Sequence, residues 1–287
     1  PTPQSTMPPE DRLGLRLANQ IELKSVLGND SLANSIYTGI DIQTKSVYAV
    51  KAFSKISSDR NGQRELRLHH IASEHRNVLQ LVRIIDAPDC MYSVMEFSPE
   101  GDLFDNITAK SMYSGDDSLI KKAFIQILNA VRFCHAHKIY HFNIQPESIL
   151  VANQGKTLKL SSFEFATTDY FSTAFNYKRN FYVSPESLRT DQGPDACYFS
   201  APHDVWSLGV VLINLICGRN PWKLASVEDA TYKAYLEGPG FLRTILPLSN
   251  DIMRFLNRVF ESDASKRIGI LELRDWVYRC PCFTVEP

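Results

Sequence analysis

The sequence of 287 residues lacks an excess of charge of either sign, with 31 lysine and arginine residues against 32 aspartate and glutamate residues. A balanced charge gives no electrostatic attraction to nucleic acid or to an anionic membrane, so no nucleic-acid partner is expected. The sequence also lacks an uninterrupted apolar run of the roughly 18 residues that a membrane-spanning helix needs. The best candidate, Val205–Cys217, is shorter and contains Ser207 and Asn214, so no membrane span is predicted.

Cysteine is sparse, with six residues scattered along the chain. Disulfide-stapled domains are shorter and richer in cysteine, and Cys280 and Cys282 lie too close in sequence to resemble a zinc-binding pair. Reduced thiols are therefore expected, and with them an intracellular location, either cytoplasmic or nuclear. The proline-rich start lacks the basic and then apolar layout of a signal peptide, and residues 1–16 are predicted to form a flexible N-terminal arm.

The first third of the chain has the pattern of a small antiparallel sheet with one helix. Alternating apolar and polar residues predict strands at about Gln20–Val26, Ser35–Asp41, Ser46–Phe53, Leu79–Asp86 and Met91–Phe97. A helical pattern begins at Arg64 and runs to about Ser73.

Helical patterns dominate the rest of the chain. Residues 118–137 carry apolar side chains at helical spacing, and Asp116, Asp117 and Ser118 offer caps for that helix. Asp204–Leu212 is apolar nearly all round, which is typical of a helix in the middle of a core. A small sheet followed by helices predicts an α+β fold.

Two segments, His141–Leu150 and Leu158–Glu164, resemble the catalytic loop (H-R-D-L-K-P-x-N) and the metal-binding loop (D-F-G) of eukaryotic protein kinases. The resemblance extends over about residues 17–283. It implies a two-lobed fold, with a small antiparallel lobe and one helix at 17–96 and a large, mainly helical lobe at 97–287 that includes the hinge. Arg64–His69 and Gly101–Phe104 are similar to a group of fungal nutrient-signalling Ser/Thr kinases.

At the positions that carry catalysis and magnesium binding in the family, this sequence has residues that cannot perform those roles. The family's catalytic Asp, its loop Lys, its loop Asn and the Asp and Gly of D-F-G are matched by Asn143, Gln145, Ser148, Ser162 and Glu164. An amide is not a base near neutral pH, and magnesium is held through carboxylates and phosphate oxygens. No intact catalytic residue and no metal site are therefore predicted.

Glu164 has two interpretations. A carboxylate beside the phosphates of ATP, with no metal between them, repels them and weakens nucleotide binding. Alternatively, Glu164 replaces the lost magnesium ligand from one residue away.

Several nucleotide-binding positions of the family are retained. Lys51 matches the phosphate-binding lysine, Glu65 its helix partner, and Gly28 is the one glycine left of the phosphate-covering loop. The other candidates implied by the resemblance are Ala49, Met95, Glu96, Ser98 and Leu150. An ion pair between Lys51 and Glu65 fits ATP binding, but it also fits a structural role, because removing one partner of a buried pair strands a charge. ATP without magnesium is thus an open alternative.

The resemblance also implies a structural framework that does not depend on catalysis. Its members are His141, Phe163, Glu186, Asp204 and Arg267. Phe142 stands where the family's Arg clamps a phosphate on the activation segment, Ser162–Glu186, and Arg179 stands where a Ser or Thr is usual. Phosphorylation of that segment is therefore not expected to switch the domain by the usual route.

The leading hypothesis is a pseudokinase, a kinase fold that acts as a protein-binding, scaffolding or allosteric signalling module with weak or absent nucleotide binding. A divergent Ser/Thr kinase, or another ATP-using transferase that recruits Glu164, Glu147 or Asp169 for metal, is the alternative. A metal-independent nucleotide sensor is a third. Candidate surfaces for protein partners are the helix around Glu65, the activation segment and residues 238–248.

Overall fold

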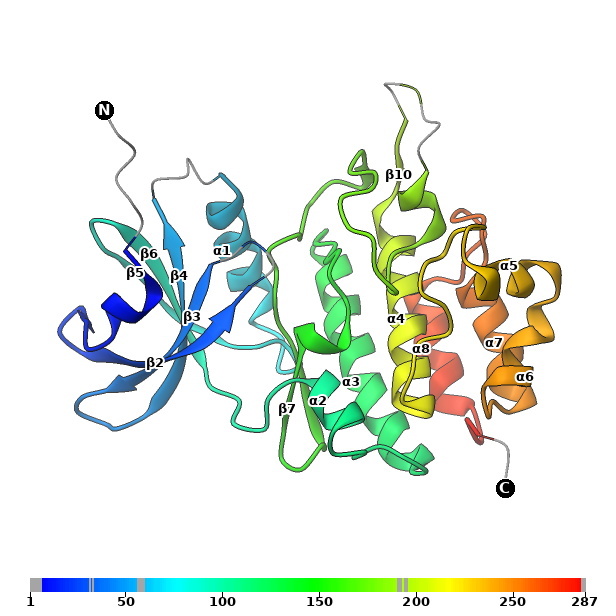
Figure 1. Cartoon of the computed structure of the whole chain (residues 1–287), viewed down its shortest axis with the longest axis horizontal. Coiled ribbons are helices and arrows are strands. Elements are labelled where there is room, and N and C mark those ends of the chain that lie inside the picture. The colour runs from blue at the N-terminus through cyan, green and yellow to red at the C-terminus, as the bar shows by residue number, and fades with distance from the viewer. Residues whose placement is uncertain are drawn as a thin grey trace.

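The computed structural model describes residues 7–30, 32, 34–55, 60–189, 193 and 196–284. Figure 1 shows two lobes, one built on a sheet and one built mainly of helices, joined by an extended segment between β6 and α2. This is the α+β architecture that the sequence predicted. The division of the chain at residues 96 and 97 remains a prediction.

The small lobe is a six-stranded antiparallel sheet in the order β1-β2-β3-β4-β6-β5, with α1 beside it. Its elements are η1 (Pro9–Arg12), β1 (Arg16–Leu17), β2 (Ile21–Asn29), β3 (Ser35–Asp41), β4 (Val47–Ser54), α1 (Arg60–Ala72), β5 (Leu81–Asp86) and β6 (Cys90–Glu96). The predicted strands agree with these bounds within a few residues, whereas α1 begins a turn earlier than predicted. Ile21, Tyr37, Val50 and Tyr92 are fully buried in the core of this lobe.

The start of the chain differs from the flexible arm expected for residues 1–16. Residues 9–12 form η1 and Arg16 pairs with Glu22 of β2, while residues 1–6 lie outside the described part. Arg12 is buried, and its guanidinium donates to Asp89 Oδ2 and to the Tyr92 hydroxyl, each at 2.6 Å. A buried guanidinium needs such partners, and they hold this segment on the sheet.

The large lobe is mainly helical. Its elements are α2 (Leu103–Thr108), α3 (Asp117–Ala136), η2 (Pro146–Ser148), β7 (Ile149–Ala152), β8 (Thr157–Leu160), β9 (Phe171–Ser172), η3 (Pro185–Leu188), β10 (Tyr198–Phe199), α4 (Ser200–Cys217), α5 (Ala230–Glu237), η4 (Pro239–Phe241), α6 (Leu242–Ile245), α7 (Asn250–Val259) and α8 (Ile270–Arg279). Asp116 caps α3 as predicted, since its side chain accepts from the Leu119 amide at 2.8 Å.

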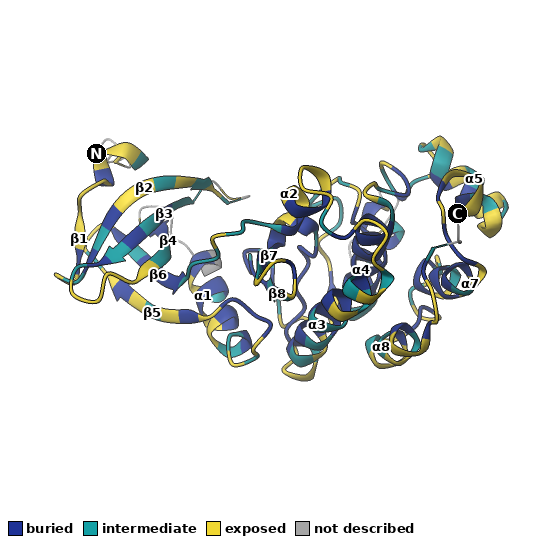
Figure 2. Ribbon diagram, turned by 90° about the horizontal axis from the view of Figure 1, so that it is seen from below, coloured by how far each residue is buried: buried dark blue, intermediate teal, exposed yellow. Residues whose placement is uncertain are grey.

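Helix α4 forms the centre of the large lobe, and Figure 2 shows it mostly in the colour of buried residues. A Cβ added to Gly209 would lie 2.4 Å from Val259, so the close approach of α4 to the end of α7 requires glycine. By length and composition alone α4 is apolar enough to cross a membrane, but 83% of it is buried inside the protein. We therefore describe it as a core helix. The six cysteines are all free.

Candidate functional site

Lys51 lies at the centre of a buried charge cluster in the small lobe. Its ammonium is 2.5 Å from Glu65 Oε1 on α1, so the structure forms the predicted pair. It is also 2.5 Å from Asp30 Oδ2, a contact that the sequence did not predict. The three side chains are only 5 or 6% exposed. Lys51 is thus already paired with two carboxylates of its own chain.

Asp30 is held in place by its own loop. Its Oδ1 accepts from the backbone amides of Leu32 at 2.9 Å and Asn34 at 2.7 Å, and its Oδ2 accepts from the Asn34 side-chain amide at 2.9 Å. This is the side-chain-to-backbone turn that aspartate favours. Asp30 lies two residues after Gly28, in the segment that resembles the phosphate-covering loop. A carboxylate of the chain therefore binds the ammonium of Lys51, which the resemblance expects to bind phosphate.

The two carboxyl groups beside Lys51 have pKa values that are shifted in opposite directions. Burial, with some help from the charges of Glu164 and Asp30, raises the pKa of Glu65 to about 7 in spite of Lys51. Burial alone would also raise the pKa of Asp30, but Lys51 and Asn34 lower it below its ordinary value. Asp30 is therefore stabilised as a carboxylate beside Lys51, whereas burial opposes the ionisation of Glu65.

The side chains of the loop that resembles the catalytic loop form a second hydrogen-bond network. Asn143 donates from Nδ2 to Glu164 Oε1 at 2.9 Å and accepts at Oδ1 from the Lys178 ammonium at 2.6 Å. Gln145 Oε1 accepts from Lys178 at 3.2 Å and from Asn180 Nδ2 at 3.1 Å. Asn143 and Glu164 are buried, and a hollow of only about 10 Å³ remains between the loop and residues 177–183. Lys178 fills the place beside Asn143.

The two serines at the expected magnesium positions, Ser148 and Ser162, make contacts within their own segments. Ser148 Oγ donates to the Gln145 carbonyl at 2.8 Å and accepts from the Gln145 amide at 3.1 Å, which closes η2. Ser162 has a positive φ of 65°, and its hydroxyl lies 3.4 Å from that of Ser161. The described residues contain no group of three His, Cys, Asp or Glu side chains placed to hold a metal ion. This donor set does not fit magnesium.

The other two acidic candidates for metal do not join Glu164. Glu147 is exposed on η2. Asp169 is exposed as well, and its Oδ2 accepts from the Thr167 hydroxyl at 2.8 Å.

The candidates at the hinge lie together and are tied to the large lobe. Ala49, Met95 and Leu150 pack in one small apolar cluster with Leu79 and Leu81. At the hinge itself, Glu96 Oε1 accepts from Lys159 of β8 at 2.5 Å and from the Gln80 amide at 2.8 Å. Ser98 Oγ donates to the Val151 carbonyl at 2.6 Å. Both polar side chains thus serve contacts within the chain.

A stack of rings connects the lobes behind these groups. Phe163 lies between His69 of α1, stacked at 5.0 Å, and His141, edge-on at 4.8 Å. His69 contacts the Leu79 carbonyl at 2.7 Å, and His141 the Ser161 carbonyl at 2.9 Å. Burial lowers the pKa of His69 to about 4 and also lowers that of His141, so both rings are neutral at pH 7.

Two buried carboxylates, Asp204 and Glu186, bond to the segments around the site. Asp204 of α4 accepts from the backbone amides of His141 and Phe142 at 2.8 and 2.9 Å and contacts His135 Nε2 at 2.9 Å. Those bonds hold Phe142 at a φ of 60°. Glu186 forms a bidentate pair with Arg267 at 2.6 and 2.8 Å.

The pattern of the protein kinase domain matches residues 21–278. The chain belongs to the protein kinase family. It is 37% identical, over 96% of its length, to a Schizosaccharomyces pombe protein named negative regulator of sexual conjugation and meiosis, of which the match covers 63%. It is 32% identical over 86% of its length to the serine/threonine-protein kinase VHS1 of Saccharomyces cerevisiae, covering 55% of that protein, and 30% identical over 78% to SKS1 of the same yeast, covering 46%.

The chain therefore spans about half to two thirds of the length of these relatives. The expected likeness to fungal Ser/Thr kinases is confirmed, since VHS1 and SKS1 are named as such and come from a yeast. The link to nutrient signalling remains a prediction.

Phe142, at the position where the resemblance expects a phosphate-clamping Arg, packs among aromatic rings. Its ring stacks on His203 of α4 at 4.8 Å, and its carbonyl accepts from the Tyr177 hydroxyl at 2.7 Å. Tyr140 and Tyr198 are buried in the same cluster. These contacts connect Phe142 to Tyr177 of the activation segment and to His203 of α4.

Four side chains that shape this site were not predicted from the sequence: Asp30, His69, Lys178 and His203. Two of them had a signal. His69 lies four residues after Glu65, one helical turn along α1, and Lys178 immediately precedes Arg179. Asp30 and His203 act through contacts between distant segments, which no local pattern reveals.

Proposed function

We propose that this domain is a pseudokinase that acts as a protein-binding, scaffolding or allosteric signalling module without phosphoryl transfer. The observation that carries the proposal is the environment of Asn143. Both ends of its amide are bound, one by Lys178 and the other by Glu164. In an active member of the family this position accepts the proton of the substrate hydroxyl, and loss of a general base costs roughly a hundred- to ten-thousand-fold in rate.

The magnesium positions support the same proposal. Phosphoryl transfer depends on positioning and on neutralising the charge of the phosphates, which the metal provides when it is bound. Ser148 and Ser162 offer neutral hydroxyls there, and Ser148 already makes two backbone hydrogen bonds. Loss of the metal compounds the loss of the base.

Weak or absent nucleotide binding is supported by Asp30. A triphosphate that approaches Lys51 must displace a carboxylate that is 2.5 Å from the ammonium and itself makes three further hydrogen bonds. Without magnesium the phosphates also meet the buried Glu164. Any ATP that binds is expected to do so without the metal.

One observation favours the alternative of a divergent Ser/Thr kinase or another ATP-using transferase. Glu164 Oε2 is buried and has no hydrogen-bond partner among the described residues. A buried carboxylate oxygen of this kind has lone pairs free to bind a proton or a cation. The yeast relatives named as Ser/Thr kinases point the same way.

Two assays on the purified domain separate these functions. One is transfer of radiolabelled phosphate from ATP to the domain itself and to a generic protein substrate. The other is thermal shift with ATP or ADP in EDTA, magnesium or manganese. We expect no transfer and little stabilisation in any condition.

Three outcomes have distinct meanings. Labelling that requires a divalent cation and disappears in Lys51→Ala would establish an active kinase and overturn the proposal. Stabilisation by nucleotide in EDTA, without labelling, would indicate a metal-independent nucleotide sensor. The absence of both effects supports a binding module.

We also propose an intracellular site of action, cytoplasmic or nuclear, on the basis of the six free thiols. Protein partners are the expected ligands of such a module.

A further inference from the structure

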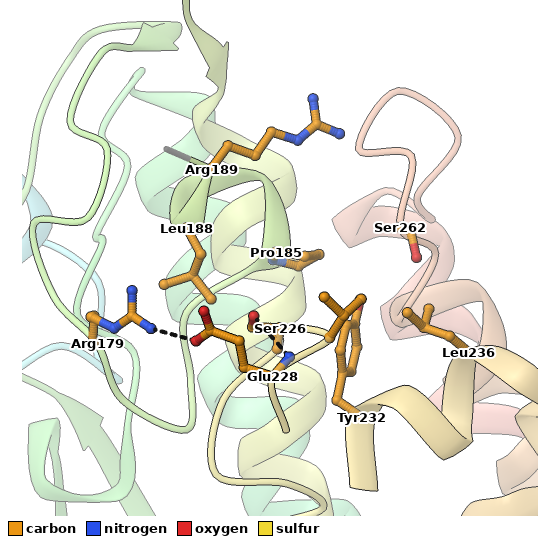
Figure 3. Close-up of a pocket in the computed structure, with 11 residues that line it drawn as sticks. Arg179, Pro185, Leu188, Arg189, Ser226, Glu228, Tyr232, Leu236 and Ser262 are labelled. Atoms are coloured by element: carbon orange, nitrogen blue, oxygen red, sulfur yellow. Dashed lines mark hydrogen bonds and ion pairs between the residues drawn. The ribbon is translucent and has the colours of Figure 1, made fainter. Parts of the chain in front are cut away.

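A hollow of about 360 Å³ lies on the large lobe between the end of the activation segment and α5 (Figure 3). Pro185 and Leu188 of η3 line one side, and Tyr232 and Leu236 of α5 line the other. Its volume lies within the range of roughly 300 to 1,000 Å³ that is usual for ligand pockets. None of the catalytic or nucleotide-binding positions lines it.

The floor of this hollow is apolar and firmly supported. Tyr232 is almost fully buried and contacts the rings of Trp222 at 5.0 Å and Trp206 at 6.1 Å. The wall, in contrast, is open to solvent, with Val227 68% and Leu236 42% exposed. Exposed apolar side chains next to a rigid concave floor are typical of a site that receives an apolar anchor.

The rim of the hollow is basic. Arg179 pairs with Glu228 at one edge of the hollow, with 3.3 Å between Nη2 and Oε2, and these side chains are 50% and 75% exposed (Figure 3). A pair as exposed as this is weak and is readily exchanged for another carboxylate. Arg189, which follows η3, lines the hollow on the side opposite Arg179 (Figure 3). No carboxylate among the described residues pairs with it. Among the described residues that line the hollow, two guanidinium groups and one carboxylate give a net positive charge.

From this combination we propose that the hollow is a docking site for an acidic segment of a partner protein. The segment inserts one leucine- or phenylalanine-sized side chain between Leu188 and Leu236, and flanking carboxylates bind Arg179 and Arg189. Guanidinium groups bind carboxylates through two parallel hydrogen bonds, so they suit this ligand better than lysine would. The proposal rests on the proposed binding function and names the chemistry of its partner.

The role of Glu228 provides a test that misfolding cannot imitate. Because Glu228 competes with an incoming carboxylate for Arg179, Glu228→Gln removes the competitor and tightens binding of an acidic peptide. Arg179→Glu together with Arg189→Glu reverses the charge of the rim and weakens binding by at least about tenfold, as expected for the loss of charge-assisted hydrogen bonds.

The experiment begins with the selection of random twelve-residue peptides displayed on phage against the whole domain. Fluorescence polarisation then gives the affinity of a selected peptide for each variant. The matched control is Arg254→Glu on α7, which reverses an arginine that is 82% exposed and does not line the hollow. The expected result is an acidic consensus around one apolar residue, tighter binding to Glu228→Gln, and no change in the control. Peptides with lysine in place of the acids should bind the double Arg variant.

Selection of no peptide, selection of peptides without acids, or equal binding by the double Arg variant and the wild type would overturn the proposal. So would a hollow filled by a second copy of the chain, seen as a dimer in sedimentation that the rim variants dissociate. These results are independent of the assays for transfer and nucleotide binding, so the two proposals fail separately.

Discussion

Two regions of the large lobe differ in how their polar side chains are bonded. One is the structural framework of Asp204, Glu186 and Arg267, and the other is the loop that resembles the catalytic loop, with Asn143 and Gln145. Arg267 and Asp204 bond charge to charge and charge to backbone amides, and both are buried. Asn143 and Gln145 are neutral amides that share one cation, Lys178. The comparison shows two ways of satisfying buried polar groups: paired charges in the framework, and neutral amides around one shared cation in the loop that resembles the catalytic loop.

The largest expected effect breaks the framework side of this comparison. Arg267→Met leaves Glu186 buried without its guanidinium, which should lower the free energy of unfolding by about 3 to 5 kcal/mol. Urea denaturation followed by circular dichroism measures it. Arg254→Met, on an exposed arginine, is the control and should change stability by less than about 0.5 kcal/mol. A loss below about 1 kcal/mol for Arg267→Met would show that the pair is dispensable.

The second effect tests the ring stack that joins the two regions. The pKa of His69 is about 4 in the folded protein and ordinarily about 6.5, so the unfolded chain binds more protons between these values. Stability should therefore be complete above pH 6.5 and fall by roughly 3 kcal/mol as the pH drops to 4. Urea titrations across this window measure the slope. His69→Phe, which keeps the stack on Phe163, should flatten it, and an unchanged slope would contradict this account.

A third, smaller effect sharpens the comparison at the reacting positions. Asn143→Asp restores the family's residue but places a carboxylate against Glu164, and we expect a loss of about 2 kcal/mol of stability. Transfer activity should stay absent. Glu164→Gln in the same chain should recover much of the loss, giving a coupling energy of at least about 1 kcal/mol in a double-mutant cycle. Additive effects would mean that the two side chains do not interact.

The smallest effect concerns the small lobe. Asp30→Asn keeps the shape of the loop and removes the charge beside Lys51, so ATP in EDTA should bind about tenfold more tightly than to the wild type. Calorimetry measures the affinity. The control is Asp86→Asn, which changes an exposed carboxylate paired with Lys55. If Asp30→Asn binds ATP no better than this control, Asp30 does not guard the cleft.

Sequence patterns predicted most of the fold because the relevant information is local. The alternation at residues 35–41 and the apolar stripe at 118–137 produced β3 and α3 almost to the residue, since side-chain period decides which face is buried. The ordered start of the chain was not predictable in this way. It depends on a contact between Arg12 and Tyr92, which are 80 residues apart.

The sequence by itself determined which chemical groups stand at the reacting positions: an amide at Asn143, hydroxyls at Ser148 and Ser162, and a carboxylate at Glu164. Residue identity is enough to exclude a strong base at the first of these positions. Only the tertiary structure decided how those groups are used. Lys178 reaches Asn143, Asp30 reaches Lys51, and Arg179 reaches Glu228, because folding brings together polar side chains that no sequence period connects.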